Sequence, residues 1–342
     1  MADQFNPYRE GENRVKDFDL TTADERFREY RHKWETYPKE RIVGDFPIHV
    51  DLELASMCNL RCPMCHTLYI DYPSFEAYQR GDAGSFMPFE TFKRAIEEAV
   101  GHRDFSSIKL NFRGEATLHP EIDKCIAYAK ERGVFEVLLN SNGNYPIELN
   151  KKLVDAGLSE ISYSFDAISP QTYKKIRVGG DYYVQMRNAM DMLRYRDKIR
   201  VCVSFVHQKA NAHEVDDFVK FWTNAGAVRI FVSDVYNPGE LIPADTLAVR
   251  KYRKRATFTC PQLWQRLTVL HNGDVYPCCH SFEEPAELRL GNVHEQSLAS
   301  MWHGEKLKEI RQVHAEGRYY EFDACYRCSY PKAQIAEGEV QP

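Results

Sequence analysis

The chain has 342 residues, of which 43% are hydrophobic and 28% are charged, with a formal net charge of −5 at pH 7. This composition is ordinary for a globular protein with one large domain and a smaller one, and the net acidity argues against broad binding to a nucleic-acid backbone. No stretch approaches 18 apolar residues, so no transmembrane helix is expected. The N-terminus lacks a secretory signal, so we expect the ten cysteines to be metal or catalytic ligands in a reducing cytoplasm.

The chain divides into three predicted segments. Residues 1–46 are polar and form an arm that either packs on a larger body or is partly disordered, with a helix predicted at residues 23–34. Residues 47–250 alternate between strand and helix patterns, and residues 251–342 form a module with further cysteines. In this module a hairpin with an Asn-Gly turn is predicted at residues 268–276 and a helix at residues 298–313.

Six apolar strand patterns alternate with helical patterns in the middle segment. The predicted strands are residues 48–54, 108–112, 135–139, 161–165, 200–206 and 229–233. The predicted helices are residues 86–100, 121–132, 149–156, 183–195 and 215–224. Such alternation indicates a parallel α/β sheet, and its periodicity does not separate an open barrel from a doubly wound sheet.

Cys58, Cys62 and Cys65 directly follow the first predicted strand with the spacing C-x3-C-x2-C. Three thiolates can hold three irons of a four-iron cluster and leave the fourth open to a small molecule, whereas four ligands would close it. The run Cys62–His66 also has the haem-attachment pattern, which requires an exported protein. The same cysteines would also suit a zinc site that adds two C-terminal cysteines, a redox pair, or buried structural positions.

A second cysteine set lies near the C-terminus. It comprises Cys260, Cys278, Cys279, Cys325 and Cys328. The two remaining cysteines, Cys125 on a predicted helix and Cys202 on a predicted strand, are expected in the core, where free cysteines are usually buried.

Polar residues follow the predicted strands, at the edge where active sites gather in parallel β/α folds. They are Arg113, Gly114 and Glu115 after the second strand, Ser141 and Asn142 after the third, Ser164 and Arg177 at and beyond the fourth, and Asp234 after the sixth.

These motifs, in this order, resemble the radical S-adenosylmethionine (SAM) enzymes that carry a C-terminal SPASM or twitch domain. The resemblance covers residues 48 to about 330 and implies a partial (β/α)6 barrel with a small α+β auxiliary-cluster domain. It implies reductive cleavage of SAM to a 5′-deoxyadenosyl radical, which abstracts hydrogen from a substrate. The sequence departs from the family pattern at Met64, which is usually aromatic, and at Arg113, which replaces the first glycine of Gly-Gly-Glu.

The resemblance also implies roles for individual residues. Cys58, Cys62 and Cys65 would bind the SAM-binding [4Fe-4S] cluster, and Cys260, Cys278, Cys325 and Cys328 one auxiliary [4Fe-4S] cluster. SAM would be held by Met64, Arg113, Gly114, Glu115, Ser141, Asn142, Ser164 and Arg177. Asp234 would act on the substrate as a base or anchor, with His207 and Tyr236 as further contacts. Cys279 would replace Cys278 as a ligand, lie buried, or donate hydrogen to a substrate radical.

The resemblance leaves the reaction open. Because the polar arm is shorter than a typical recognition domain, we expect a small polar substrate (a carbohydrate, cyclitol or nucleotide sugar) that is dehydrogenated or epimerised. A peptide- or protein-modifying maturase would have the same motifs and, from another class, so would an iron–sulfur electron-transfer protein without SAM chemistry. A flavodoxin- or ferredoxin-type electron donor is implied, and neither nucleic acid nor membrane is expected as a partner.

Overall fold

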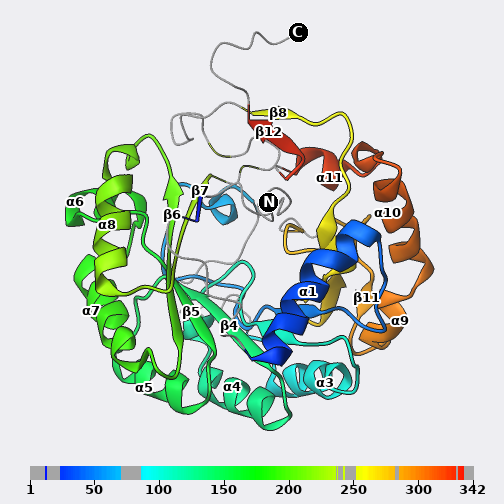
Figure 1. The fold of residues 1–342 in the computed structure, drawn as a ribbon, viewed down its shortest axis with the longest axis horizontal. Helices are drawn as coiled ribbons and strands as arrows, with labels where there is room; N and C mark the ends of the chain where they lie inside the picture. Colours follow the sequence, from blue (N-terminus) through cyan, green and yellow to red (C-terminus); the bar gives the residue numbers. More distant parts are fainter. Residues whose placement is uncertain are drawn as a thin grey trace.

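The computed structural model describes residues 12–13, 24–70, 86–235, 237, 242, 252–281, 285–328 and 330–334. Within these ranges it contains a ten-stranded sheet and a separate two-stranded ribbon (Figure 1). The strands are β1 (Glu12–Asn13), β2 (His49–Leu52), β3 (Ser107–Lys109), β4 (Glu136–Ser141), β5 (Glu160–Ser164), β6 (Arg200–His207), β7 (Arg229–Asp234), β8 (Tyr252–Lys254), β9 (Arg266–Val269), β10 (Asp274–Tyr276), β11 (Gly291–Asn292) and β12 (Lys332–Gln334). No helix in these ranges has the length and apolar character needed to cross a membrane.

Strands β2 to β7 form a parallel sheet in which each strand pairs with the next one along the chain. A doubly wound sheet would reverse its strand order at a switch point. The sequential order is instead that of an open barrel, so the barrel prediction is confirmed and the doubly wound sheet is excluded.

Helices cover the outside of this barrel (Figure 1). They are α3 (Phe89–Ala99), α4 (Ile122–Glu131), α5 (Glu148–Asp155), α6 (Pro170–Ile176), α7 (Tyr182–Met192) and α8 (Val215–Ala225). Alternate residues of the strands, such as Val137 and Leu139 of β4, are buried against these helices. The residues between them, such as Leu138 and Asn140, stay partly exposed on the inner face of the barrel. The sequence analysis missed α6, although Ser169 as N-cap and Pro170 at the first position are typical helix-start signals.

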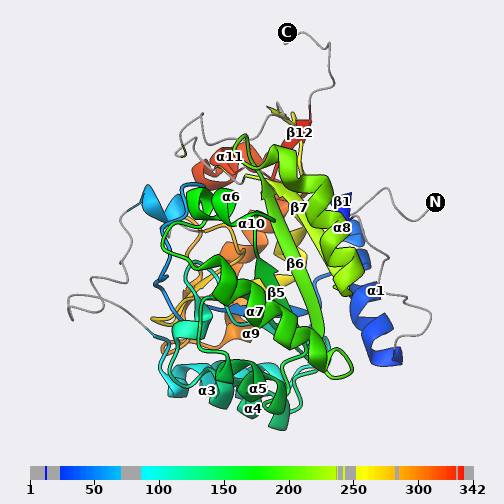
Figure 2. The same cartoon turned by 90° about the vertical axis from the view of Figure 1, so that its left-hand side faces the viewer.

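The N-terminal arm contains helix α1 (Glu25–Glu40), which covers the end of the barrel where the strands begin. The Trp34 ring lies edge-on to His49 of β2, with ring centroids 5.8 Å apart. Phe27 lies under the guanidinium of Arg200, the first residue of β6. The described part of the arm therefore packs on the barrel. Figure 2 shows α1 and α6 on opposite sides of the molecule.

The C-terminal module continues the barrel sheet. Strand β9 pairs in parallel with β2, and β10 pairs antiparallel with both β9 and β11. The predicted hairpin is confirmed, with Gly273 (φ +90°) in its turn. The single helix predicted at residues 298–313 is wrong: the chain forms α9 (Leu298–Trp302) and α10 (Glu305–Ala315), because it turns extended at Gly304 (φ −66°, ψ 155°). A short helix, α11 (Asp323–Arg327), follows, and the predicted division between residues 250 and 251 stays a prediction.

Candidate active site

The first cysteine set lies in the loop that follows β2. Cys62 is buried and Cys58 and Cys65 are partly exposed, and none of the three forms a disulfide. Burial raises the pKa of Cys58 and raises that of Cys62 to about 11, and the neighbouring Cys65 adds to both shifts. Thiols that crowd together in this way suit an iron cluster, whose irons deprotonate their cysteine ligands. The Leu60 amide donates to Cys58 Sγ at 3.4 Å, the kind of contact that cluster sulfurs accept.

The described residues contain no three His, Cys, Asp or Glu side chains that converge on a single metal ion. Among these residues, the zinc site that would join Cys62 and Cys65 to Cys325 and Cys328 is therefore not formed.

Gly114 brings the loop after β3 against the cysteine loop. A Cβ atom at this position would lie 2.2 Å from the carbonyl oxygen of Ala55 and 2.5 Å from that of Met57. The amide of Glu115 donates to the same Met57 oxygen at 2.8 Å. Only glycine permits this approach, which gives a physical reason for the predicted Gly-Glu pair.

The Glu115 carboxylate organises the loop after β4. It accepts hydrogen bonds from Ser141 Oγ (2.8 Å), from the Asn142 amide (2.7 Å) and from the amide and hydroxyl of Thr117. Burial raises the pKa of Glu115, and these donors oppose the shift. Asn142 in turn donates to Asn59 at 2.7 Å and approaches Cys58 Sγ at 3.7 Å. The structure therefore brings Glu115, Ser141 and Asn142 together beside Cys58, as a cofactor site requires.

Arg113 lies on a different network from its neighbours Gly114 and Glu115. Its guanidinium forms two hydrogen bonds with the buried carboxylate of Glu53, at 2.7 and 2.9 Å. His271, from the hairpin of the C-terminal module, contacts the same carboxylate at 2.9 Å. The side chain thus links the barrel to the module, and only the main chain of Arg113 remains for the predicted cofactor role.

Arg177 lies beside the cysteine loop, and its predicted contact with the SAM carboxylate stays a prediction. Its guanidinium pairs with Asp166 at 2.5 Å and approaches Cys62 Sγ at 3.8 Å. Asp166 adopts a left-handed conformation (φ +61°), which is costly for a non-glycine residue and typical of functional sites. The sequence analysis did not single out Asp166, although its position directly after the fourth strand was a usable signal. Ser164 lies nearby on β5, 3.4 Å from Ser204 of the next strand.

Met64 belongs to a small apolar cluster around the cysteine loop. Its buried members also include Leu60, Cys62 and Ile176, and Val206 and Val235 pack against it. Met64 therefore lies next to the predicted cluster ligands and to the ends of β6 and β7.

His207 and Asp234 form a pair where β6 and β7 end. The two residues are register partners, and His207 Nδ1 lies 3.5 Å from Asp234 Oδ1. Both are partly exposed and stand one residue from Val206 and Val235, which pack beside Cys62 and Met64. The structure thus places two of the three predicted substrate contacts together, while Tyr236 lies outside the described residues.

The second cysteine set lines a pocket in the C-terminal module. Cys260, Cys278, Cys325 and Cys328 all face it. Burial raises the pKa of Cys278 to about 12 and also raises that of Cys260 and Cys325, and charge repulsion among the thiolates adds to each shift. These four side chains fit an auxiliary cluster as the first three fit theirs.

His314 contacts two of these ligands. The Cys260 amide donates to His314 Nδ1 at 3.3 Å, so Nε2 carries the proton and donates to Cys325 Sγ at 3.4 Å. Burial lowers the pKa of His314 to about 4, so the ring is neutral. Such an outer contact orients a ligand and tunes the metal that it holds, and the sequence analysis had no signal for it.

Cys279 is not among the residues that line the pocket of Cys278, although Gln262 and His280 are. Its Sγ donates to Gln262 at 3.2 Å and lies 3.4 Å from His280 Nδ1. Burial raises the pKa of Cys279, and the charges of Arg266 on β9 and Asp51 on β2 act on it in opposite directions. Cys279 therefore lies between the auxiliary pocket and the inner face of the barrel. Of the remaining free cysteines, Cys125 lies in the core and Cys202 is buried against Arg229, on the inner face of the barrel.

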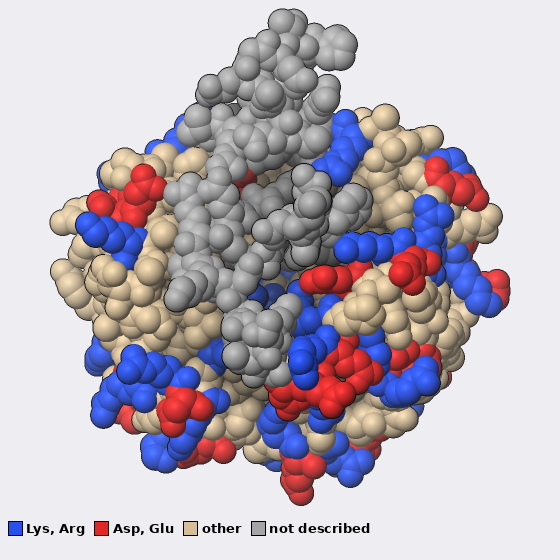
Figure 3. Space-filling view, viewed as in Figure 1, with Lys and Arg blue, Asp and Glu red and all other residues tan. Residues whose placement is uncertain are grey.

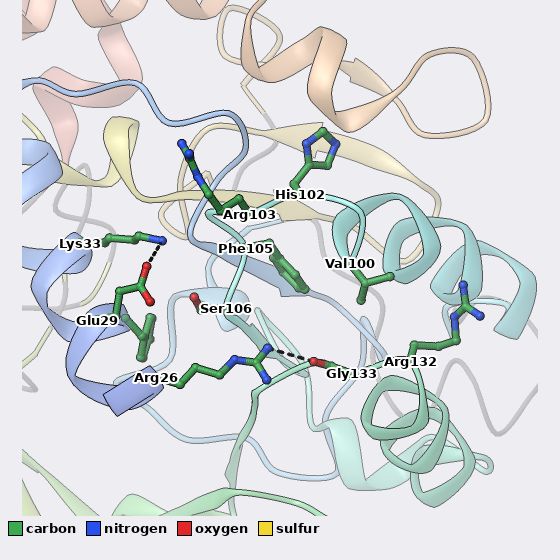
Figure 4. Close-up of a pocket in the computed structure, with 11 residues that line it drawn as sticks. Arg26, Glu29, Lys33, Val100, His102, Arg103, Phe105, Ser106, Arg132 and Gly133 are labelled. Carbon is green, nitrogen blue, oxygen red and sulfur yellow. Dashed lines mark hydrogen bonds and ion pairs between the residues drawn. The ribbon is translucent and has the colours of Figure 1, made fainter. Parts of the chain in front are cut away.

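A separate pocket lies outside the barrel, beneath α1 (Figure 4). Arg26, Lys33, Arg103 and Arg132 give it a basic lining. Two of these side chains have partners within the protein. Lys33 pairs with Glu29, and Arg26 donates to the Gly133 carbonyl just beyond α4. Helix C-termini attract cations in this way. Elsewhere on the face shown in Figure 3, positive and negative side chains are interspersed.

Two family models match this chain. The model of the Radical SAM superfamily matches residues 52–221, and that of the SPASM iron-sulfur cluster-binding domain matches residues 260–329. The first runs from the end of β2 into α8 and includes the first cysteine set, and the second covers the part of the module with the pocket of four cysteines.

Two curated relatives align with this chain over most of its length and over most of their own length. The tungsten-containing aldehyde ferredoxin oxidoreductase cofactor-modifying protein of Pyrococcus furiosus is 23% identical over 321 residues, which cover 81% of this chain and 86% of that protein. The PqqA peptide cyclase of Xanthomonas campestris is 24% identical over 331 residues, covering 85% of this chain and 81% of the cyclase.

Solved structures share the fold at low identity. BtrN in complex with AdoMet and 2-DOIA has a TM-score of 0.57 and 18% identity, covering 83% of this chain and 93% of that one. Streptococcus suis SuiB bound to the precursor peptide SuiA has a TM-score of 0.61 and 14% identity, covering 93% of this chain and 77% of that one.

Proposed function

Because the chain belongs to the radical SAM superfamily and carries a SPASM domain, we propose that it is a maturase that abstracts a hydrogen atom from a residue of a peptide or protein. When bound, the SAM-binding cluster supplies the electron that cleaves SAM to methionine and a 5′-deoxyadenosyl radical. A peptide or protein thus replaces the small polar molecule as the favoured substrate.

The observation that supports a peptide is the extent of similarity to the PqqA peptide cyclase. It runs over 85% of this chain, whereas the probable GTP 3′,8-cyclase of Methanococcus maripaludis aligns with only 38%. SuiB, solved with a precursor peptide, shares the architecture over 93% of this chain.

The residues around the first cysteine set would hold and orient the cofactor. Glu115 fixes the loop that carries Ser141 and Asn142, so that Asn142 stands against Cys58. Arg177 is held by Asp166 next to Cys62, where a guanidinium suits the SAM carboxylate. These positions are held by contacts within the protein.

A second candidate function is oxidation or epimerisation of a small polar substrate. The His207–Asp234 pair favours it, because a carboxylate beside an imidazole can accept the proton of a substrate hydroxyl. BtrN, solved with 2-DOIA, shares this fold.

The test follows hydrogen abstraction directly. Anaerobically reconstituted, reduced protein is mixed with SAM and either a deuterated tryptic peptide pool or deuterated monosaccharides and cyclitols, and 5′-deoxyadenosine is analysed by mass spectrometry. We expect 5′-deoxyadenosine that carries deuterium from the peptide pool. Deuterium from the sugar and cyclitol pool alone would favour the second candidate. No 5′-deoxyadenosine under any condition would favour an electron-transfer protein without SAM chemistry.

A further inference from the structure

Lys109 is the last residue of β3, and its side chain lies on the inner face of the barrel. The preceding residue, Ile108, is fully buried in the core beneath the helices, so Lys109 faces the opposite way. Its register partner on β2 is Asp51, whose carboxylate contacts Arg266 and His49. Lys109 is partly exposed, as are Leu138 and Asn140 on the inner face of β4, whereas His49 and Asp51 of β2 are buried.

The arginines on this face and at its rim each have a carboxylate partner. Arg113 pairs with Glu53, Arg177 with Asp166, Arg266 with Asp51, and Arg200 and Arg229 both with Glu160. Lys109 has no ion pair and no side-chain hydrogen bond within the described part of the chain. A cation held in a barrel without a partner is costly to desolvate, unless a ligand supplies the negative charge.

The charged groups that face Lys109 cancel each other and leave its own positive charge uncompensated. Asp51 and Arg266 offset each other, since their side chains lie 3.0 Å apart. The remaining groups are His49 from β2 and Cys279 and His280 from the C-terminal module. Burial lowers the pKa of His49, so its neutral ring adds no charge.

The position of Lys109 also suits a substrate contact. Cys279 and His280 stand on the module side, and His280 is an electrostatic neighbour of His66, the residue that follows Cys65. Lys109 therefore lies on the face that both cysteine sets border, below the strand ends where the SAM-site residues gather.

We infer that Lys109 binds a carboxylate of the substrate, which in a peptide is an aspartate or glutamate side chain. The inference rests on the proposed function and adds a charge requirement to it. An ammonium group in this setting is a point charge with three donors and accepts a carboxylate or a phosphate. Lys109 is thus a specificity-determining residue that selects acidic substrates.

The test measures binding to the reconstituted, SAM-loaded protein by anaerobic titration calorimetry. The probes are the capped tripeptides N-acetyl-Ala-Glu-Ala-amide and N-acetyl-Ala-Gln-Ala-amide, together with inorganic phosphate. We expect the Glu peptide to bind more tightly than the Gln peptide, and Lys109→Met to weaken the Glu peptide roughly ten- to a hundredfold without affecting the Gln peptide. Tighter binding of phosphate than of the Glu peptide would overturn the carboxylate assignment.

Lys152→Met is the matched control. Lys152 is exposed on α5, far from the inner face, so removing its charge should leave both peptide affinities unchanged. Equal affinity of Lys109→Met and the unaltered protein for the Glu peptide would overturn the inference. So would a loss of SAM affinity in Lys109→Met, which would assign the lysine to the cofactor. SAM cleavage by the unaltered protein is scored separately, so the proposed function can stand when the inference fails.

Discussion

At the scale of single residues, Gly114 carries the contact between the second strand and the cysteine loop. The sequence pattern predicted a glycine–glutamate pair at a cofactor site, and the structure shows what each member does. Gly114 permits main-chain contact with Ala55 and Met57, and Glu115 holds the next loop. Arg113, in the position of the first family glycine, serves a structural ion pair instead.

Gly114→Ala should disrupt the first cysteine set. The added methyl would meet two carbonyl oxygens at 2.2 and 2.5 Å, so the cysteine loop must shift. We expect destabilisation of about 1–3 kcal/mol and loss of SAM-dependent change in the EPR spectrum of the reduced protein. The measurements are thermal unfolding and EPR after reconstitution.

Gly101→Ala is the control for this substitution. Its nearest atom is a carbonyl oxygen at 3.4 Å, an ordinary contact, and it lies just beyond α3. It should behave like the unaltered protein. If Gly114→Ala also retained full stability and the SAM response, the close approach would have no role in the site.

At the scale of elements, helix α1 closes the end of the barrel opposite the site. Its aromatic residues contact the beginnings of β2 and β6, where the inner-face charges also pair. Arg266 of β9 stacks on Trp34, with its guanidinium 5.0 Å from the ring centroid. The helix therefore joins the barrel and the C-terminal module from below.

Trp34→Ala should lower thermal stability. Loss of a buried tryptophan costs about 3–5 kcal/mol, and because Trp34 is only half-buried we expect about 2–3 kcal/mol, which is several degrees in thermal midpoint. The iron content should stay unchanged, because the cysteines lie at the other end. Tyr183→Ala, an aromatic residue 69% exposed on α7, is the control and should have little effect. An equal midpoint for both variants would show that α1 does not stabilise the barrel.

At the scale of the whole molecule, the pairing of β9 with β2 brings the two cysteine sets to one face. Four residues of each strand are in register, so the module is a continuation of the barrel sheet. Glu53 reinforces the junction by binding both Arg113 of the barrel and His271 of the module. The two sites are therefore fixed relative to each other by the same hydrogen bonds that build the sheet.

The iron content should separate the two sites. We expect about eight irons per reconstituted chain, and about four after Cys58, Cys62 and Cys65 are replaced by alanine. Cys278→Ser should also reduce the iron content, because Cys278 lines the auxiliary pocket. Cys279→Ser should keep it, because Cys279 is not among the residues that line this pocket and its Sγ donates to Gln262. Equal losses in these two serine variants would contradict the ligand assignment.

The sequence by itself determined the alternation of strands and helices, the family and the two cysteine sets. These features are local: a strand pattern has period two, a helix has a capping residue, and a cluster loop has fixed spacing. The same local rules failed at residues 298–313, where one apolar pattern spans two helices.

Only the tertiary structure decided which side chains meet. Segments that lie far apart in the chain come together in the fold, and their meeting determines four features. These are the partner of Arg113, the role of Asp166, the contacts of Cys279 and the lack of a partner for Lys109 among the described residues. The sequence analysis left either Cys278 or Cys279 as the cluster ligand, because two adjacent cysteines fit the same spacing of the cysteine set. Both residues lie beyond the end of β10, and only the folded chain shows that Cys278 lines the auxiliary pocket while Cys279 contacts Gln262.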